Sequence, residues 1–276
     1  MITFTLALLF LIGGYFIYGR FVERVFKPDV NRKTPAYTKA DGVDYLVLPN
    51  WKIFMIQFLN IAGLGPIFGA IMGAQFGTAS YLWIVFGTIF GGAVHDFFGG
   101  ALSLRHDGES LPQLIGRYLG NRTRKVMTVF SVVLMVLVGA VFVSGPAELL
   151  SGMTPVWMNA YFWMIVIFLY YILATLCPID KIIGRVYPLF AIALLFMALG
   201  LLVALFIHQP DLPEMWHGFG TKYETSPIFP MMFISIACGA ISGFHATQSP
   251  LMARCMKNEK QCRPIFYGAM VTEGIV

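Results

Sequence analysis

Charged residues are scarce in this chain, and their scarcity is the first constraint on its fold. Asp, Glu, Lys and Arg make up 12% of the 276 residues, whereas hydrophobic residues make up 58%. A soluble domain of ordinary composition has roughly a quarter of its residues charged. The mean hydropathy is +0.73. Several apolar runs reach roughly 20 residues, enough to cross the hydrocarbon of a bilayer. The sequence therefore predicts an all-α polytopic membrane protein.

Cysteine is also sparse, and the chemistry-bearing motifs of common enzymes are missing. The four cysteines are Cys177, Cys238, Cys255 and Cys262, and no two form a CxxC pair, so they lack a usual zinc spacing. The chain has no Walker loop, no dinucleotide fingerprint and no HExxH motif. These absences argue against an ATP-driven pump and against an enzyme, and we expect no metal and no cofactor.

The positive charge follows the loops and does not indicate a nucleic-acid partner. The net charge is +5, and every Lys and Arg except Lys222 lies in one of four segments, at 20–52, 105–125, 181–185 and 254–263. The intervening loops hold only Lys222. By the positive-inside rule the four basic segments are cytoplasmic, which places the N-terminus outside.

The apolar runs predict seven membrane helices and the start of an eighth. We expect helices at about 1–18, 53–74, 80–102, 126–147, 157–176, 186–207 and 228–251, with the eighth starting near 264. The first run has no basic residues before it, which indicates a retained span and not a signal peptide. The last run is too short to cross a bilayer, so we expect the full protein to continue.

Two of these spans contain helix breakers where hydrocarbon should be. Gly63, Gly65 and Pro66 interrupt the span at 53–74. Gly239, Gly243 and Pro250 interrupt the span at 228–251. Unpaired backbone groups cost several kcal/mol in lipid, so such breaks persist only against protein or a water-filled cavity. The alternative interpretation is two packing kinks, because Gly and Pro are common in membrane helices.

The spacing of the interrupted spans favours a transport site over kinks. They lie five spans apart and run in opposite directions, which is typical of inverted-repeat transporters. We therefore expect one transmembrane domain over 1–276, with a peripheral span at 1–18, a first five-helix repeat at 53–207 and the start of a second repeat at 228–276. The predicted substrate-binding residues are Gly63, Gly65, Pro66, Gly239, Gly243 and Gln248.

Four titratable residues lie inside predicted spans. They are His95, Asp96, His245 and Glu273. Ionisable residues in a membrane usually face the interior of the helix bundle, and glycines four residues away on either side of His95 and Asp96 favour faces packed against protein. Histidine titrates near neutral pH, so a proton relay is the functional prediction. Buried structural hydrogen bonds are the alternative for each residue.

Long stretches of the chain resemble the carbon starvation protein A family. The resemblance rests on QFLNIAGLGPIFGAIMGAQFG (57–77), GTIFGGAVHDFFGGALSLRHDGESLPQLIG (87–116), ACGAISGFHATQSPLMARC (237–255) and DGVDYLVLPNW (41–51). It implies a bacterial inner-membrane protein that takes up peptides or pyruvate during nutrient limitation. It also implies the broken-helix, inverted-repeat core of amino acid–polyamine–organocation transporters, in a protein longer than this one.

These observations together predict a secondary active transporter in the lipid bilayer. Its substrate would be a short peptide or pyruvate, and its coupling ion a proton. Peptide and pyruvate both present a carboxylate, so the sequence leaves both open, and it leaves Na⁺ coupling and the oligomeric state open as well. The alternatives are a membrane nutrient sensor or scaffold that binds ligand without net transport and, less favoured, a channel.

Overall fold

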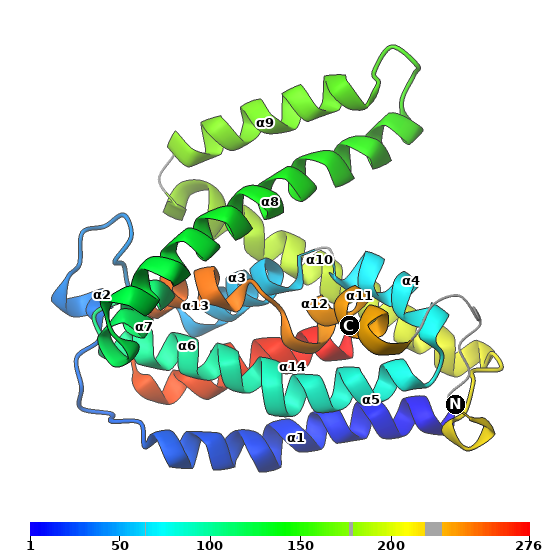
Figure 1. Cartoon of the computed structure of the whole chain (residues 1–276), viewed down its shortest axis with the longest axis horizontal. Helices are drawn as coiled ribbons and strands as arrows, with labels where there is room; N and C mark the ends of the chain where they lie inside the picture. Colours follow the sequence, from blue (N-terminus) through cyan, green and yellow to red (C-terminus); the bar gives the residue numbers. More distant parts are fainter. Residues whose placement is uncertain (64, 177–178, 219–227) are drawn as a thin grey trace. The chain divides into compact units, whose positions relative to one another are not determined.

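The computed structural model describes residues 1–63, 65–176, 179–218 and 228–276, without the side chains of 66, 67, 176 and 179–186. Pro66, Lys181, Arg185, Cys177 and Lys222 therefore lie outside the described residues, or have side chains that do. Within those ranges the chain is helical and has no strand (Figure 1).

The α-helices have the following bounds: α1 Ile2–Phe26, α2 Pro35–Thr38, α3 Asn50–Ala62, α4 Ala70–Gly73, α5 Ala79–Phe86, α6 Ala93–Arg105, α7 Leu111–Leu119, α8 Asn121–Met153, α9 Ala160–Leu176, α10 Ile179–His208, α11 Phe233–Ser235, α12 Ala237–Ile241, α13 His245–Ala253 and α14 Gly268–Ile275. Short π-helical turns occupy Gly65–Gly69, Gly87–Gly92, Ile228–Met232 and Arg263–Tyr267, and 3-10 turns occupy Ala74–Phe76, Met215–His217 and Glu259–Gln261.

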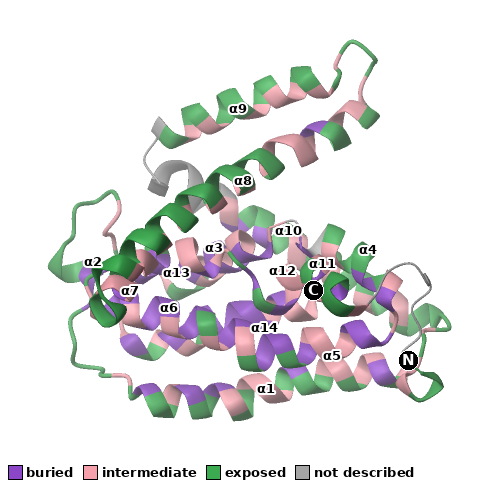
Figure 2. Ribbon diagram, in the orientation of Figure 1, coloured by how far each residue is buried: buried purple, intermediate pink, exposed green. Residues whose placement is uncertain are grey.

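The chain divides into two compact units. The larger is Met1–Leu111 with Ile183–Val276, and the smaller is Pro112–Ile182. In the smaller unit α8 and α9 run side by side as a pair, and the Tyr171 hydroxyl donates to the Phe142 carbonyl at 3.1 Å (Figure 1). Ala147 is the buried residue of α8, and most of both helices is exposed (Figure 2). Long helices that are apolar on every side and exposed are the kind that contact lipid.

Four helical stretches of the described chain are long and apolar enough to cross a membrane, at Ile2–Phe26, Ala79–Arg105, Asn121–Met153 and Tyr187–His208. A fifth is possible if Ile228–Ser235 and Ala237–Ala253, which are bent by 68°, form one span. Spans near 1–18, 80–102, 126–147 and 186–207 thus match the predicted positions, although 126–147 is part of a longer helix. About eight transmembrane helices and an inverted repeat remain predictions.

Both predicted helix breaks occur, with one shift in position. Helix α3 ends at Ala62, and Gly63 has φ 51° and ψ −126°, a conformation that a side chain disfavours. The second break lies at Ser242, with φ 34°, between α12 and α13. The prediction that Gly239 and Pro250 interrupt this span was wrong, because Gly239 lies within α12 and Pro250 within α13. The 68° bend in the same span lies earlier, at Ile236, between the end of α11 and the start of α12.

Small residues bring the helices of the larger unit into close contact. A Cβ on Gly92 would lie 2.7 Å from the Ala240 carbonyl oxygen, so the backbone of α12 packs directly on the π-turn before α6. That turn leaves carbonyl groups out of the helical ladder. The Tyr267 hydroxyl, fully buried, donates to one of them, the Ile89 carbonyl, at 2.9 Å. Helices α3, α6, α13 and α14 all contribute buried residues to the core of this unit (Figure 2).

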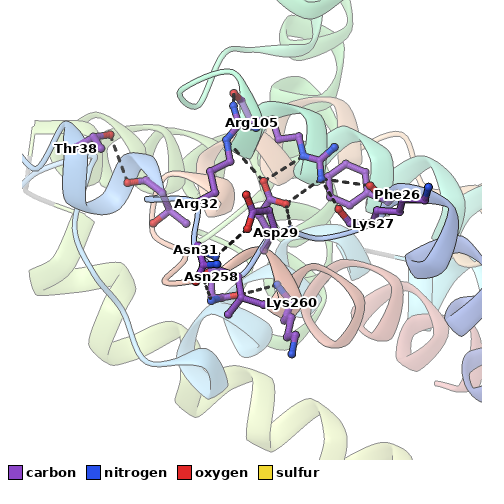
Figure 3. A network of polar contacts seen from close by, with 12 residues as sticks. Phe26, Lys27, Asp29, Asn31, Arg32, Thr38, Arg105, Asn258 and Lys260 are labelled. Carbon is purple, nitrogen blue, oxygen red and sulfur yellow. Dashed lines mark hydrogen bonds and ion pairs between the residues drawn. The ribbon is translucent and has the colours of Figure 1, made fainter.

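A buried ion pair joins the ends of α1 and α6 to the Glu259–Gln261 turn (Figure 3). Arg105 donates to both carboxylate oxygens of Glu259, at 2.9 and 3.1 Å, and Glu259 also accepts the Asp29 N–H at 2.7 Å. The same guanidinium donates to the carbonyls of Phe26 and Lys27, which end α1. We call these residues the Arg105–Glu259 network. It satisfies a fully buried carboxylate and the helix-end carbonyls at once.

Candidate functional site

A buried polar cluster lies where α3, α6 and α13 meet. Asp96 of α6 is fully buried. It accepts hydrogen bonds from Gln57 of α3, at 2.9 and 3.1 Å to its two oxygens, and from the Ser249 hydroxyl of α13. Gln57 also donates to Ser249 at 3.2 Å. Because apolar neighbours surround these groups, each interaction is stronger than it would be in water.

Two histidines extend this cluster toward the surface of the larger unit. His245 is fully buried, and its Nε2 lies 3.7 Å from an Asp96 oxygen. Its Nδ1 lies 3.2 Å from Nδ1 of His95, which is exposed. A pair of nitrogens at this distance can share one proton, since one ring donates while the other accepts. His95, His245 and Asp96 therefore follow one another from an exposed imidazole to a buried carboxyl, although among the described residues Nε2 of His245 has no hydrogen-bond partner. We call these residues with Gln57 and Ser249 the Asp96 cluster.

The Asp96 cluster contains no permanent cation. In the part of the chain that the structure describes, no Lys or Arg is paired with Asp96, and its one basic neighbour is His245. Gln57 keeps one buried oxygen, Oε1, without a hydrogen-bond partner. A buried carboxyl without a cation can be neutral or ionised depending on small changes around it. The arrangement can therefore hold or pass a proton.

Side chains near the second helix break donate hydrogen bonds to the unpaired backbone carbonyls at the first. The carbonyls of Ile61 and Ala62 at the end of α3 have no partner within their own helix. Ile61 accepts the Ser242 hydroxyl at 3.1 Å, and Ala62 accepts the Cys238 thiol at 3.4 Å. Thr88, in the π-turn before α6, adds a third contact, since its hydroxyl donates to the Gly239 carbonyl at 3.2 Å. Such pairing explains how non-helical backbone persists inside an apolar bundle.

A cavity of about 800 Å³ lies beside these breaks. Its walls come from α1, the Gly65–Gly77 segment, α5, residues 211–213 and the end of α14, and they include Gly65, Gly239 and Glu273. This volume falls in the range of sites for small molecules. A Cβ on Gly65 would lie 2.8 Å from the Cys238 sulfur, so the glycine lets the two broken segments approach.

The structure brings most of the predicted site residues to two neighbouring places. His95, Asp96 and His245 form one group, and Gly65, Gly239 and Glu273 line the cavity. Gly63 and Gly243 lie at the two breaks. Gln248 accepts a hydrogen bond from Asn60 at 3.2 Å and does not line the cavity. The side chain of Pro66 lies outside the described residues. His95 was predicted on a glycine-lined face packed against protein; it contacts His245 of α13, but it is exposed.

Several members of the site were not identified from the sequence. They are Gln57, Asn60, Thr88, Cys238, Ser242 and Ser249. Gln57 and Asn60 had a usable signal, since they are polar residues on one side of an otherwise apolar run. Single hydroxyls and thiols carry no such signal, because Ser, Thr and Cys are ordinary constituents of membrane helices.

Comparison with known proteins gives a clear family match. The chain matches the family described as Carbon starvation protein CstA over residues 1–155 and 147–276. It is 43% identical to a Haemophilus influenzae protein described as an uncharacterized membrane protein, over 100% of this chain and 88% of the relative. It is 30% identical to a Campylobacter jejuni protein named peptide transporter CstA, over 95% of this chain and 47% of the relative.

A relative with another substrate in its name is similarly distant. The Escherichia coli pyruvate/proton symporter BtsT is 28% identical, over 95% of this chain and 46% of the relative. The chain therefore spans most of the Haemophilus relative but about half the length of these named transporters. No solved structure matches. Relatives that are membrane proteins, together with the apolar helices, show a multi-pass membrane protein.

Proposed function

We propose that this chain, which belongs to the carbon starvation protein CstA family, forms the substrate pathway of a secondary active transporter. The substrate is a short peptide or pyruvate, taken up across the bacterial inner membrane during nutrient limitation, and a proton gradient drives the uptake. The names of the Campylobacter and Escherichia relatives support a transporter with a small-molecule substrate. The basic loops support the N-terminus outside.

One observation carries the proposal: two interrupted helices meet at their breaks beside a cavity. Ser242 and Cys238 donate to the last carbonyls of α3, and Gly65 and Gly239 from the two interrupted segments line the 800 Å³ cavity. In transporters, discontinuous helices present free backbone groups to the substrate at such a junction. A rearrangement of either break would therefore change the cavity wall directly.

The Asp96 cluster supplies the proton coupling in this proposal. Asp96 is bonded to α3 through Gln57 and to α13 through Ser249, and each of these helices ends or begins at a break. Protonation of Asp96 removes an acceptor and adds a donor, which changes the hydrogen bonds to both helices. The exposed His95 and buried His245 give the proton a route. Glu273, the fourth predicted coupling residue, lies apart in the cavity wall.

The first experiment is uptake of labelled pyruvate and a labelled dipeptide by cells or vesicles containing the full-length protein, with and without a protonophore. We expect one of the two substrates to accumulate and the accumulation to collapse when the protonophore is added. Accumulation that resists the protonophore but needs Na⁺ would contradict proton coupling. Ligand binding without any accumulation would overturn the transporter and favour a nutrient sensor.

A further inference from the structure

Carboxyl groups line the cavity beside the helix breaks, and no basic side chain among its described lining matches them. The ionisable residues among its described lining are Tyr81, Asp211 and Glu273, and neither Lys, Arg nor His is present. The remaining lining is mostly glycine, alanine and larger apolar residues. In a site with low-dielectric walls, lining of one sign selects the opposite charge in the ligand.

Glu273 is the most buried of these groups. It is 3% exposed, and its Oε2 has no hydrogen-bond partner in the described residues. Its Oε1 receives a single weak contact from the Cys238 thiol, at 3.6 Å. A carboxylate accepts up to four hydrogen bonds, so this buried group has unused capacity. A buried polar atom without a partner is destabilising and calls for a complementary group.

The packing of α14 holds Glu273 in this position. A Cβ on the next residue, Gly274, would lie 2.7 Å from the Thr88 hydroxyl, so α14 contacts the π-turn before α6 directly. In the π-helical turn that follows α3, a Cβ on Gly65 would lie 3.5 Å from Glu273 Oε1. The carboxyl therefore stands next to the backbone of Gly65, with the Cys238 thiol beside it.

We propose that Glu273 binds the ammonium group of an amine-bearing substrate in this cavity. An ammonium offers a positive charge and three N–H donors, which complement the unpaired carboxylate oxygen. A monocarboxylate such as pyruvate instead adds a second negative charge where no basic side chain opposes it. This inference rests on the proposed transport function and favours the amino terminus of a short peptide over pyruvate.

The test is equilibrium binding to the purified chain in lipid nanodiscs, with labelled Ala-Ala as the probe. We expect N-acetyl-Ala-Ala and pyruvate each to compete with Ala-Ala about tenfold less well or worse than unlabelled Ala-Ala, because each lacks the ammonium bond. We expect Glu273→Gln to weaken Ala-Ala binding by a similar factor and Glu273→Asp to weaken it less. Glu148→Gln, an exposed position of α8, is the matched control and leaves binding unchanged.

Three results would overturn the inference. The first is equal competition by free and acetylated dipeptide. The second is Ala-Ala binding that Glu273→Gln leaves intact. The third is a Glu273-dependent response to NaCl without any response to amines, which would make this an inorganic cation site. Thermal unfolding of Glu273→Gln separates lost binding from lost folding. If instead the transport proposal is wrong, binding of Ala-Ala would still depend on Glu273, but no protonophore-sensitive accumulation would be seen.

Discussion

Two buried carboxyl groups lie near opposite ends of α6 and have contrasting surroundings. Glu259 meets Arg105 from the end of this helix, through two hydrogen bonds, and also accepts a backbone N–H. Asp96, in the first turn of α6, meets an amide, a hydroxyl and a histidine. Both are fully buried or nearly so, yet only the first has a permanent cation.

The contrast separates a structural carboxylate from a switchable one. An ion pair held by several charge-assisted bonds joins Glu259 to Arg105 and fixes the ends of α1 and α6. Neutral partners and an imidazole let Asp96 exist with or without its proton. One helix thus ends at an ion-paired carboxylate and, in the proposed function, carries the proton-sensitive contact at its other end. Substitutions at the Glu259 ion pair should therefore lower stability, whereas substitutions in the Asp96 cluster should affect transport.

The largest effect on stability is expected from Arg105→Ala. It removes two hydrogen bonds to the buried Glu259 carboxylate and leaves the half-exposed Arg32, whose Nε lies 3.9 Å away, as the remaining cation. This loss costs about 3 kcal/mol of unfolding free energy. Denaturation of the purified protein in detergent measures this loss. Lys39→Ala is the control, because Lys39 and Asp107 form an exposed ion pair at 3.4 Å and such pairs contribute about 1 kcal/mol or less. Equal stability of the two variants would show that Glu259 does not depend on Arg105.

Asp96→Asn should remove coupling while the fold remains. Asparagine keeps an acceptor for the Ser249 hydroxyl, and Gln57 can turn its unpaired oxygen toward the new amide. We expect protonophore-sensitive uptake to fall to the level seen with protonophore present, with a stability change below about 1.5 kcal/mol. His245→Ala should also uncouple transport, and Asp44→Asn, a half-exposed carboxylate outside the Asp96 cluster, is the control. Intact accumulation in both Asp96→Asn and His245→Ala would refute the coupling scheme.

The sequence was sufficient to predict the features that depend on local pattern, namely the interior ionisable residues and the approximate helix breaks. Ionisable residues in apolar runs predicted Asp96 and His245 as interior positions, and Gly63 and Gly243 predicted breaks close to those observed. The break in the second span lies at Ser242, since Gly239 continues α12 and Pro250 lies inside α13. Composition predicts where a helix can fail, whereas packing decides which weak point does.

The contacts between distant segments could not be predicted in the same way. Arg105 and Glu259 are separated by 154 positions, and both lie in segments that resemble ordinary basic loops. Gln57 and Ser249 are 192 positions apart. Nothing local specifies such pairs, because they depend on how α3, α6 and α13 pack. The positive-inside pattern accounts for Arg105 as a loop residue and says nothing of its buried partner.

A glycine between the two regions of α6 provides a smaller test. A Cβ on Gly100 would lie 2.2 Å from the buried Phe266 ring, so Gly100→Ala should force α6 and the Arg263–Tyr267 turn apart. We expect a loss of about 1–3 kcal/mol in unfolding free energy from overpacking. Gly139→Ala in α8 is the matched control, since its Cβ meets nothing within 4 Å. That substitution should stabilise by up to about 1 kcal/mol through helix propensity. Indistinguishable variants would mean that α6 is not packed this tightly.

The smallest effect is expected at a third carboxylate, Asp41, which is exposed and bound by backbone groups alone. Its Oδ1 accepts the N–H groups of Val43, Asp44 and Tyr45 at 2.8, 2.9 and 2.8 Å. These hydrogen bonds, that of Tyr45 foremost, lower the pKa of Asp41 below its ordinary value of 3.8. Because the folded pKa is the lower one, the bonds stabilise this loop above pH 3.8 and are lost as the pH falls through the folded pKa.

The measurement is a ¹³C NMR titration of the Asp41 carboxyl, with Asp41→Asn to assign the signal. A midpoint below 3.8 is expected, together with loss of the loop conformation below that midpoint and little change in global unfolding. A midpoint at or above 3.8 would show that backbone N–H groups do not hold the ionised form. The expected order of effects would then fail, in which a carboxylate paired with a cation, Glu259, matters most, one with neutral side chains, Asp96, is intermediate, and one with backbone amides, Asp41, matters least.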